Sequence, residues 1–110
     1  MRWPENRKLA CGPTWWLALA ETAYDQGEAE VTILAEDAAS GQPSPGLAIA
    51  ARPDMDGMSH AHDVEVLTDL GDGSYVGSLE FDMAGLWSIT GYVADDVRSE
   101  AFTFVVEVQP

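Results

Sequence analysis

Apolar and polar residues alternate along much of the chain with a period of two. In one such segment, Val31, Ile33 and Ala35 fall on one face, with Glu30 and Thr32 on the other. A strand with one buried face has this period, because successive side chains point to opposite sides. The pattern therefore predicts strands throughout, and only residues 17–24 could alternatively form a helix.

Turn-forming residues separate seven segments of strand length. The expected strands are residues 14–20, 28–35, 47–52, 62–67, 75–81, 86–93 and 101–108. We expect Pro53 to end the third strand, because proline removes a backbone donor. Seven short strands with frequent turns predict an all-β fold, an antiparallel two-sheet β-sandwich of Ig-like architecture. Trp87, Ile89 and Ile33 are expected in its core.

The length of 110 residues suits a single domain with one hydrophobic core. We expect residues 1–12 to form an N-terminal tail and residues 13–110 to form the sandwich. Trp15 and Trp16 are adjacent in the first expected strand, so they should face opposite sides. One of the two rings should therefore lie near the surface.

A formal net charge of −14 narrows the range of partners. After residue 8 the only basic residues are Arg52 and Arg98. Such a surface repels phosphate backbones, so binding to nucleic acid or to an anionic membrane is disfavoured. The acidity would suit a cationic partner or a high-salt environment, and it also simply favours solubility. No apolar run reaches the length of a membrane span.

Cys11 is the only cysteine, so the chain has no internal disulfide. The string Leu9-Ala10-Cys11-Gly12 resembles the end of a bacterial lipoprotein signal, in which the cysteine becomes lipidated. Residues 4–8 are polar, however, whereas such a signal needs an apolar stretch before the cleavage site. Two interpretations stay open: the tail is the remnant of a leader, or Cys11 is an ordinary cysteine.

Both histidines and two of the four methionines fall within eight residues: Met55, Met58, His60 and His62. Thioether sulfur and neutral imidazole are ligands that Cu(I) accepts, whereas zinc sites more often include cysteine or a carboxylate. We predict that this loop binds one copper ion, with Met58 and His60 as core ligands and Met55 and His62 as additions. The alternative is a loop whose methionines fill a gap in the packing and whose histidines are solvated.

The sequence gives less support to an additional copper ligand, to calcium binding and to catalysis. Met83 could add a ligand from a neighbouring turn, although methionine is also a common packing residue. Calcium would need six to eight oxygens. The acidic residues near turns that could supply them, without an EF-hand pattern, are Asp54, Asp56, Asp69, Asp72, Asp95 and Asp96. The chain lacks a phosphate-binding loop, a nucleophile elbow and an H-E-x-x-H pair, so we expect a binding module and not an enzyme.

A longer motif lies in the second half of the chain. It consists of Gly73-Ser-Tyr75-Val-Gly77 followed by Phe81-Asp-Met83-Ala-Gly85-Leu-Trp87-Ser-Ile89. This motif resembles the G-x-Y … F-x-M-x-G-x-W pattern of the YtkA-like and FixH-like group of bacterial extracytoplasmic domains. The methionine-rich loop one strand earlier and Cys11 before the first strand also fit, so the resemblance extends over about residues 11–108.

The resemblance implies a small β-sandwich outside the cytoplasm, in a group found in copper and cytochrome-oxidase contexts. It does not impose one activity. Two functions follow as expectations. The first is a copper-binding accessory or chaperone domain that works with an envelope protein. The second is a metal-free structural or protein-interaction sandwich within a membrane-associated export or oxidase assembly.

Overall fold

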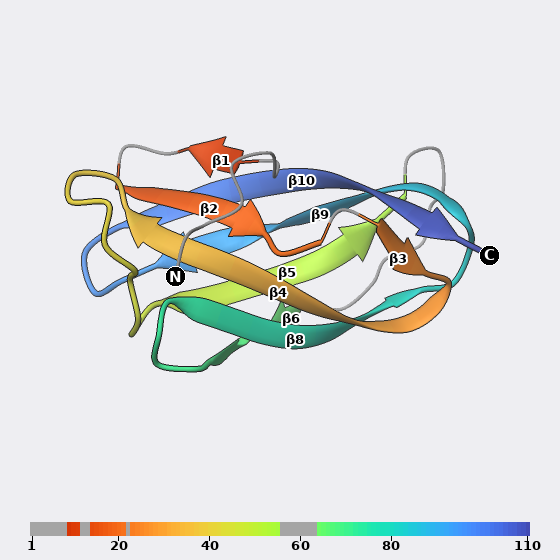
Figure 1. The fold of residues 1–110 in the computed structure, drawn as a ribbon, viewed down its shortest axis with the longest axis horizontal. Helices are drawn as coiled ribbons and strands as arrows, with labels where there is room; N and C mark the ends of the chain where they lie inside the picture. Colours follow the sequence, from red (N-terminus) through yellow and green to blue (C-terminus); the bar gives the residue numbers. More distant parts are fainter. Residues whose placement is uncertain (1–8, 12–13, 22, 56–63) are drawn as a thin grey trace.

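Two five-stranded sheets face each other in the computed structural model, which describes residues 9–11, 14–21, 23–55 and 64–110 (Figure 1). The first sheet contains, in spatial order, β1 (Leu9–Cys11), β2 (Trp15–Leu19), β4 (Gly27–Asp37), β8 (Ser74–Phe81) and β7 (Thr68–Asp69). The second contains β3 (Ala23–Asp25), β10 (Ser99–Gln109), β9 (Gly85–Ala94), β5 (Ala48–Asp54) and β6 (Glu65–Val66). The described residues include no helix, and so none able to cross a membrane.

Strand pairing confirms the predicted sandwich. All neighbouring strands run antiparallel except β3, which pairs with β10 in parallel. Without the short strands β1, β3 and β6, the orders are β2-β4-β8-β7 and β5-β9-β10. These orders correspond to the ABED and CFG sheets of the immunoglobulin arrangement.

The hydrophobic core lies between the two sheets and uses alternate residues of each long strand. Trp87, Ile89 and Ile33 are buried, as expected from the sequence. Trp15 is also buried, whereas its neighbour Trp16 is 43% exposed, which confirms that the two rings face opposite sides. Each large apolar side chain removed from water contributes roughly 1.5–3 kcal/mol, so this layer supplies most of the favourable energy of folding.

The expected end of the third strand at Pro53 is wrong. Strand β5 continues to Asp54, and Pro53 pairs with Ile89 of β9. On its other side, β5 pairs with β6 only at Ala50 and Ala51 among the described residues. Proline is tolerated where no second strand needs its missing N–H, and this explains why the strand passes through it.

The single strand expected over residues 62–67 is also wrong in its described part. The chain instead forms β6 in the second sheet and then β7 in the first sheet. Leu67 stands between them and is buried, while Val66 is 74% exposed. Leu67 thus anchors the crossing between the sheets, because its Cδ2 occupies the space beside Gly77 of β8 that a Cβ atom would fill.

Two three-residue strands were not anticipated. Strand β1 covers Leu9–Cys11, within the expected tail, and pairs with β2 so that Cys11 lies opposite Trp16. Strand β3 lies between the first two expected strands, and its Tyr24 is buried. Three residues are too few to show a clear alternation, which is why the sequence pattern did not reveal them.

Candidate metal-binding end of the sandwich

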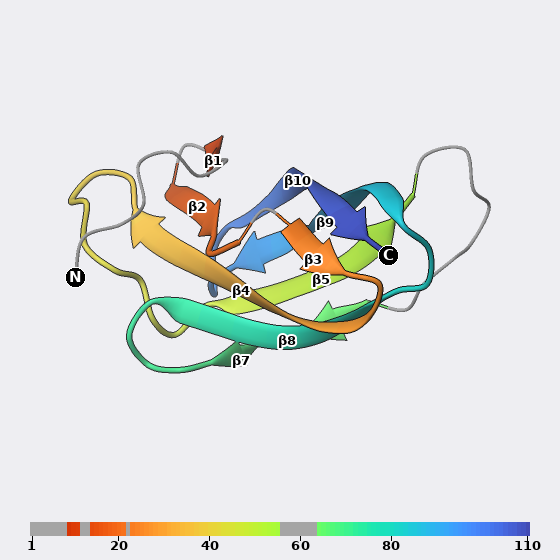
Figure 2. The same cartoon turned by 45° about the vertical axis from the view of Figure 1, so that its right-hand side comes forward.

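Four segments that are distant in the sequence meet at one end of the sandwich, and we call this region the Met55 end. Figures 1 and 2 show there the end of β5, the turn between β8 and β9, strand β3 and the C-terminal end of β10. Strand register agrees with this placement. Asp54 pairs with Ser88, and Val108 pairs with both Gly85 and Tyr24.

Met55 directly follows β5, and its side chain lies against the start of β9, beside the β8–β9 turn. Its side chain is half-buried and packs against the hydrophobic core. Its Cε would lie 2.7 Å from a Cβ atom added to Gly85, so the terminal methyl occupies the space beside this glycine. Gly85 also has a φ of +139°, a conformation that other residues rarely adopt. Glycine is therefore favoured there by its backbone conformation, and a larger residue would also displace the end of the Met55 side chain.

Met83 lies in the same turn, two residues before Gly85, and is 42% exposed. Two hydrogen bonds hold the backbone of this turn in place. The Trp87 indole Nε1 donates to the Met83 carbonyl oxygen at 2.8 Å, and the Gln26 side-chain Nε2 donates to the Asp82 carbonyl oxygen at 3.1 Å. The turn is thus anchored to the core on one side and to the β3–β4 connection on the other.

Aromatic rings form a layer of the core beneath the Met55 end. Tyr24 stacks on Phe81 with ring centroids 5.6 Å apart, and Phe81 meets Trp87 edge to face at 5.3 Å. All three side chains are buried. This layer stabilises the core beneath the Met55 end, because edge-to-face and stacked aromatic pairs add to the energy gained from burial alone.

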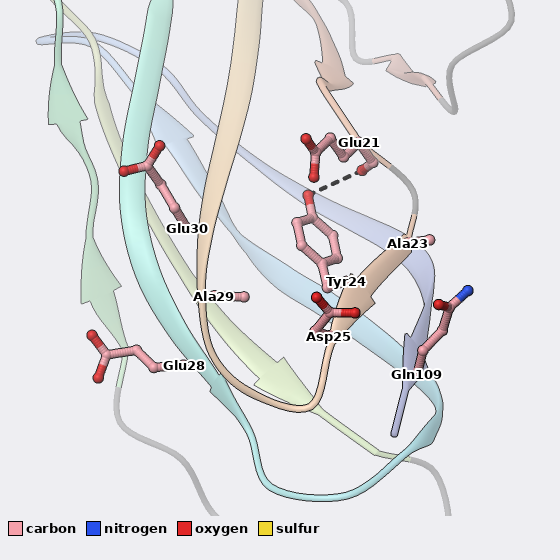
Figure 3. A pocket seen from close by; sticks show the side chains of 8 residues that line it. All are labelled: Glu21, Ala23, Tyr24, Asp25, Glu28, Ala29, Glu30 and Gln109. Atoms are coloured by element: carbon pink, nitrogen blue, oxygen red, sulfur yellow. Dashed lines mark hydrogen bonds between the residues drawn. The ribbon is translucent and has the colours of Figure 1, made fainter.

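A hollow of about 260 Å³ lies beside the Tyr24 ring at this end (Figure 3). The Tyr24 hydroxyl donates to the Glu21 carbonyl oxygen at 3.0 Å. The acidic residues that line the hollow are Glu21, Asp25, Glu28 and Glu30. In Figure 3, Glu28 and Glu30 point away from the Tyr24 ring, so the carboxylates do not converge on one point. They make the region electronegative without forming a chelating group.

The structure describes only one of the four residues predicted to bind copper. Met55 lies against the turn that carries Met83, whereas Met58, His60 and His62 lie outside the described residues. Within the described ranges, no three His, Cys, Asp or Glu side chains are grouped so that they could hold a metal ion. The sequence pattern did not predict that Met55 lies close to Gly85. The one sign of this proximity in the sequence is the glycine within the F-x-M-x-G-x-W motif.

Two of the acidic residues considered for calcium, Asp69 and Asp95, hold turns in place. The Asp69 carboxylate accepts hydrogen bonds from the backbone N–H groups of Gly71 and Gly46, at 2.8 and 2.7 Å. Asp95 likewise accepts from the backbone N–H groups of Val97 and Arg98, at 2.8 and 2.7 Å. These carboxylates stabilise turns, as aspartate commonly does. Asp56 lies outside the described residues.

Comparison with known proteins gives one match. A family model described as YtkA-like matches residues 14–91, a range that contains both the Met/His segment and the later motif. No curated protein and no solved structure matches the chain.

Proposed function

The chain belongs to the YtkA-like family, and on that basis we propose that it is a non-enzymatic extracytoplasmic module that binds one copper ion at the Met55 end. The observation that carries this proposal is the position of Met55. Its side chain, which carries the thioether, lies over Gly85. The turn that leads into Gly85 carries Met83, which is exposed. Two methionines from separate segments therefore occupy the same end of the fold.

The chemistry of these side chains favours Cu(I). Thioether sulfur is a soft, neutral ligand, and imidazole nitrogen adds a borderline ligand that copper also accepts. The chain carries a net charge of −14, and the nearby hollow is lined by four acidic residues. Such a field raises the local concentration of cations. Within this proposal, Met58 and His60 are the core ligands, Met55 and His62 complete the set, and Met83 is an additional donor from the turn.

The proposal is tested by competition titration of Cu(I) under reducing conditions. We expect the parent protein to bind one equivalent and the Met58→Ala/His60→Ala double variant to bind at least tenfold more weakly. Met55→Leu should also weaken binding while leaving the fold intact, since exchange of methionine for leucine usually costs less than about 1.5 kcal/mol. Equal affinity in all these proteins, or no binding by the parent, would overturn the proposal.

Placement outside the cytoplasm forms part of the same proposal. Its support is the family membership together with the lipoprotein-like string around Cys11. Expression of the native gene with its own upstream sequence, followed by cell fractionation, tests this placement. Fatty-acid labelling that disappears in Cys11→Ser would establish the lipid anchor. Recovery of the protein in the cytoplasm alone would contradict it.

A metal-free interaction module is the second candidate function. The observation that favours it is the packing of Met55 against the hydrophobic core, which is what a gap-filling methionine does. The two candidates differ in the effect of Met55→Leu. A packing role predicts a small change in stability and unchanged copper affinity, whereas a ligand role predicts weaker copper binding.

A further inference from the structure

The outer faces of the two sheets differ sharply in charge. On the first sheet, the side chains of β4 and β8 that point away from the core include four glutamates, and no strand of that sheet contains a basic residue. The four are Glu28, Glu30, Glu36 and Glu80. Glu28 and Glu80 are even paired directly across the two strands. Like charges in this position repel each other, so this face is built to remain in solvent.

The outer face of β5, β9 and β10 is different, and we call it the neutral face. Only three charged residues occupy its outward positions: Arg52, Asp54 and Glu107. Large apolar side chains are exposed on it, among them Tyr92 at 61% and Leu86 at 67%. Depletion of charge together with an exposed aromatic residue is the composition of a protein interface core.

The register of the three strands aligns the side chains of this face in rows. Arg52 lies beside Thr90, which lies beside Thr103. Two residues further along, Asp54 lies beside Ser88, which lies beside Val105. The residues between these two rows are Pro53, Ile89 and Phe104, and they point into the core and are buried. This row of buried residues marks a line across the strands, and Arg52 and Asp54 stand on opposite sides of it.

We propose that the neutral face binds a second copy of this chain, with a two-fold axis that crosses the strands above the buried residues Pro53, Ile89 and Phe104. Such an axis places Arg52 of each copy opposite Asp54 of the other, so that two ion pairs form. It also places Tyr92 of each copy opposite Leu86 of the other, because these residues stand at matching distances on β9 on either side of the axis. An isologous interface requires this kind of self-complementary pattern.

The charge of the protein decides which faces two copies of the chain can bring together. Two molecules that each carry −14 repel each other, and the repulsion is greatest where their acidic faces approach. Contact through the neutral faces directs the two glutamate-bearing faces to opposite sides of the dimer. A groove between Arg52, Thr90 and Tyr92 on this face offers space for a side chain of the other copy.

The size of the face can be compared with that of known interfaces. Strands about 4.8 Å apart and residue pairs about 6.8 Å apart give roughly 500 Å² for each copy. The two copies together would bury roughly 1,000 Å², which is the lower limit for a specific interface, so we expect a weak, reversible dimer. The dimer should form with or without copper, because none of the face residues belongs to the Met/His segment.

Sedimentation velocity of the full chain over a range of concentrations, with a copper chelator present, tests the proposal. We expect a monomer–dimer equilibrium in the parent. Arg52→Asp places like charges opposite each other, and it should raise the dissociation constant at least tenfold. Asp54→Arg should do the same, even though it lowers the net negative charge. The charge swap Arg52→Asp/Asp54→Arg should restore the dissociation constant to within about threefold of the parent.

Glu30→Arg is the matched control, because it changes the net charge as much as Asp54→Arg but lies on the outer face of the first sheet. It should leave dimer formation unchanged or strengthen it. Circular dichroism and thermal unfolding of each variant confirm that the fold is retained. A parent that stays monomeric at all concentrations, or a dimer that neither single variant weakens, would overturn the proposal. Since copper is absent throughout, such a failure would not affect the proposed copper site.

Discussion

The indole Nε1 of Trp87 donates a hydrogen bond to the backbone carbonyl oxygen of Met83, 2.8 Å away. Trp87 is buried in the aromatic layer, whereas Met83 is partly exposed to solvent. A single core residue therefore fixes the backbone that presents a methionine at the Met55 end. The position of the candidate site depends in this way on the core packing beneath it.

Substitution of Trp87 tests this dependence. Trp87→Ala removes a buried ring and should lower the free energy of unfolding by about 3–5 kcal/mol. Trp87→Phe keeps an aromatic ring but loses the hydrogen bond, and we expect a smaller cost of about 1–3 kcal/mol. Urea unfolding followed by circular dichroism measures both values. Trp16→Phe is the control, because Trp16 is 43% exposed and its replacement should cost less than about 1 kcal/mol. Equal losses at Trp16 and Trp87 would contradict the described burial.

Gly91 is required by the close approach of β5. A Cβ atom at this position would clash with the Ala50 carbonyl oxygen, so the backbone itself would have to move. Gly91→Ala should therefore destabilise the fold by about 3 kcal/mol or more. Gly77→Ala is a useful comparison, since the atom nearest its Cβ is Leu67 Cδ2, the end of a side chain that can rotate. Thermal unfolding should show a smaller loss for Gly77→Ala; the reverse order would refute this interpretation.

Tyr75 fastens the proline-containing loop to the core. Its hydroxyl donates to the Ser44 carbonyl oxygen at 2.6 Å and accepts from the Leu47 backbone N–H at 3.0 Å. Tyr75→Phe should cost about 1–3 kcal/mol, because the Leu47 N–H loses its partner. Chemical denaturation measures this loss, and a cost near zero would show that water replaces the hydroxyl.

Burial also raises the pKa of Tyr75 above its ordinary value of 10.0, and the negative charge of Asp69 adds to this effect. A group whose pKa is raised in the folded state stabilises the fold at pH values below its unfolded-state pKa. That stabilisation is lost as the pH rises through the folded-state pKa. We therefore expect the stability difference between the parent and Tyr75→Phe to shrink only above about pH 10.

Acid should act on the turns that aspartates hold. The backbone N–H groups of Arg98 and Val97 donate to Asp95 and lower the pKa of its carboxyl below 3.8. A carboxyl whose pKa is lowered in the folded state stabilises the fold at pH values above its unfolded-state pKa. That stabilisation disappears as the pH falls through the folded-state pKa. The melting temperature of Asp95→Asn should thus lie below that of the parent near neutral pH and approach it below about pH 3.8. A constant difference at all pH values would exclude ionisation as the cause.

The long strands were predictable because each has one buried face. Val31 and Ile33 of β4, like Trp87 and Ile89 of β9, alternate with residues that point outward, and this pattern is local. Pro53 could not be placed in β5 from the sequence, because its tolerance depends on how far β6 extends along the neighbouring edge. That extent is a property of the assembled sheet.

The candidate site was predictable only in its composition. The concentration of methionine and histidine in residues 55–62 is visible in the sequence, but the contact between Met55 and Gly85 joins positions thirty residues apart. It arises because Asp54 of β5 pairs with Ser88 of β9, which brings the start of β9 beside Met55. Such a contact follows from strand register, which alternation alone does not determine.

Gly85→Ala separates the position of Met55 from its chemistry. The added methyl group would meet Met55 Cε at 2.7 Å, so the side chain would have to move away from the turn that carries Met83. If Met55 is a copper ligand at this position, Cu(I) affinity should fall roughly tenfold, which equals a loss of about 1.4 kcal/mol. Competition titration under reducing conditions measures this change.

The same substitution also strains the backbone, because Gly85 has a φ of +139°. Gly71→Ala controls for this strain, since Gly71 has a φ of +88° and a Cβ atom there would have no neighbour within 4 Å. Both variants should lose stability, by about 1 kcal/mol or more, because alanine is disfavoured at positive φ. Only Gly85→Ala should weaken copper binding. Unchanged affinity in Gly85→Ala would show that the position of Met55 beside Gly85 serves packing and not the binding of copper.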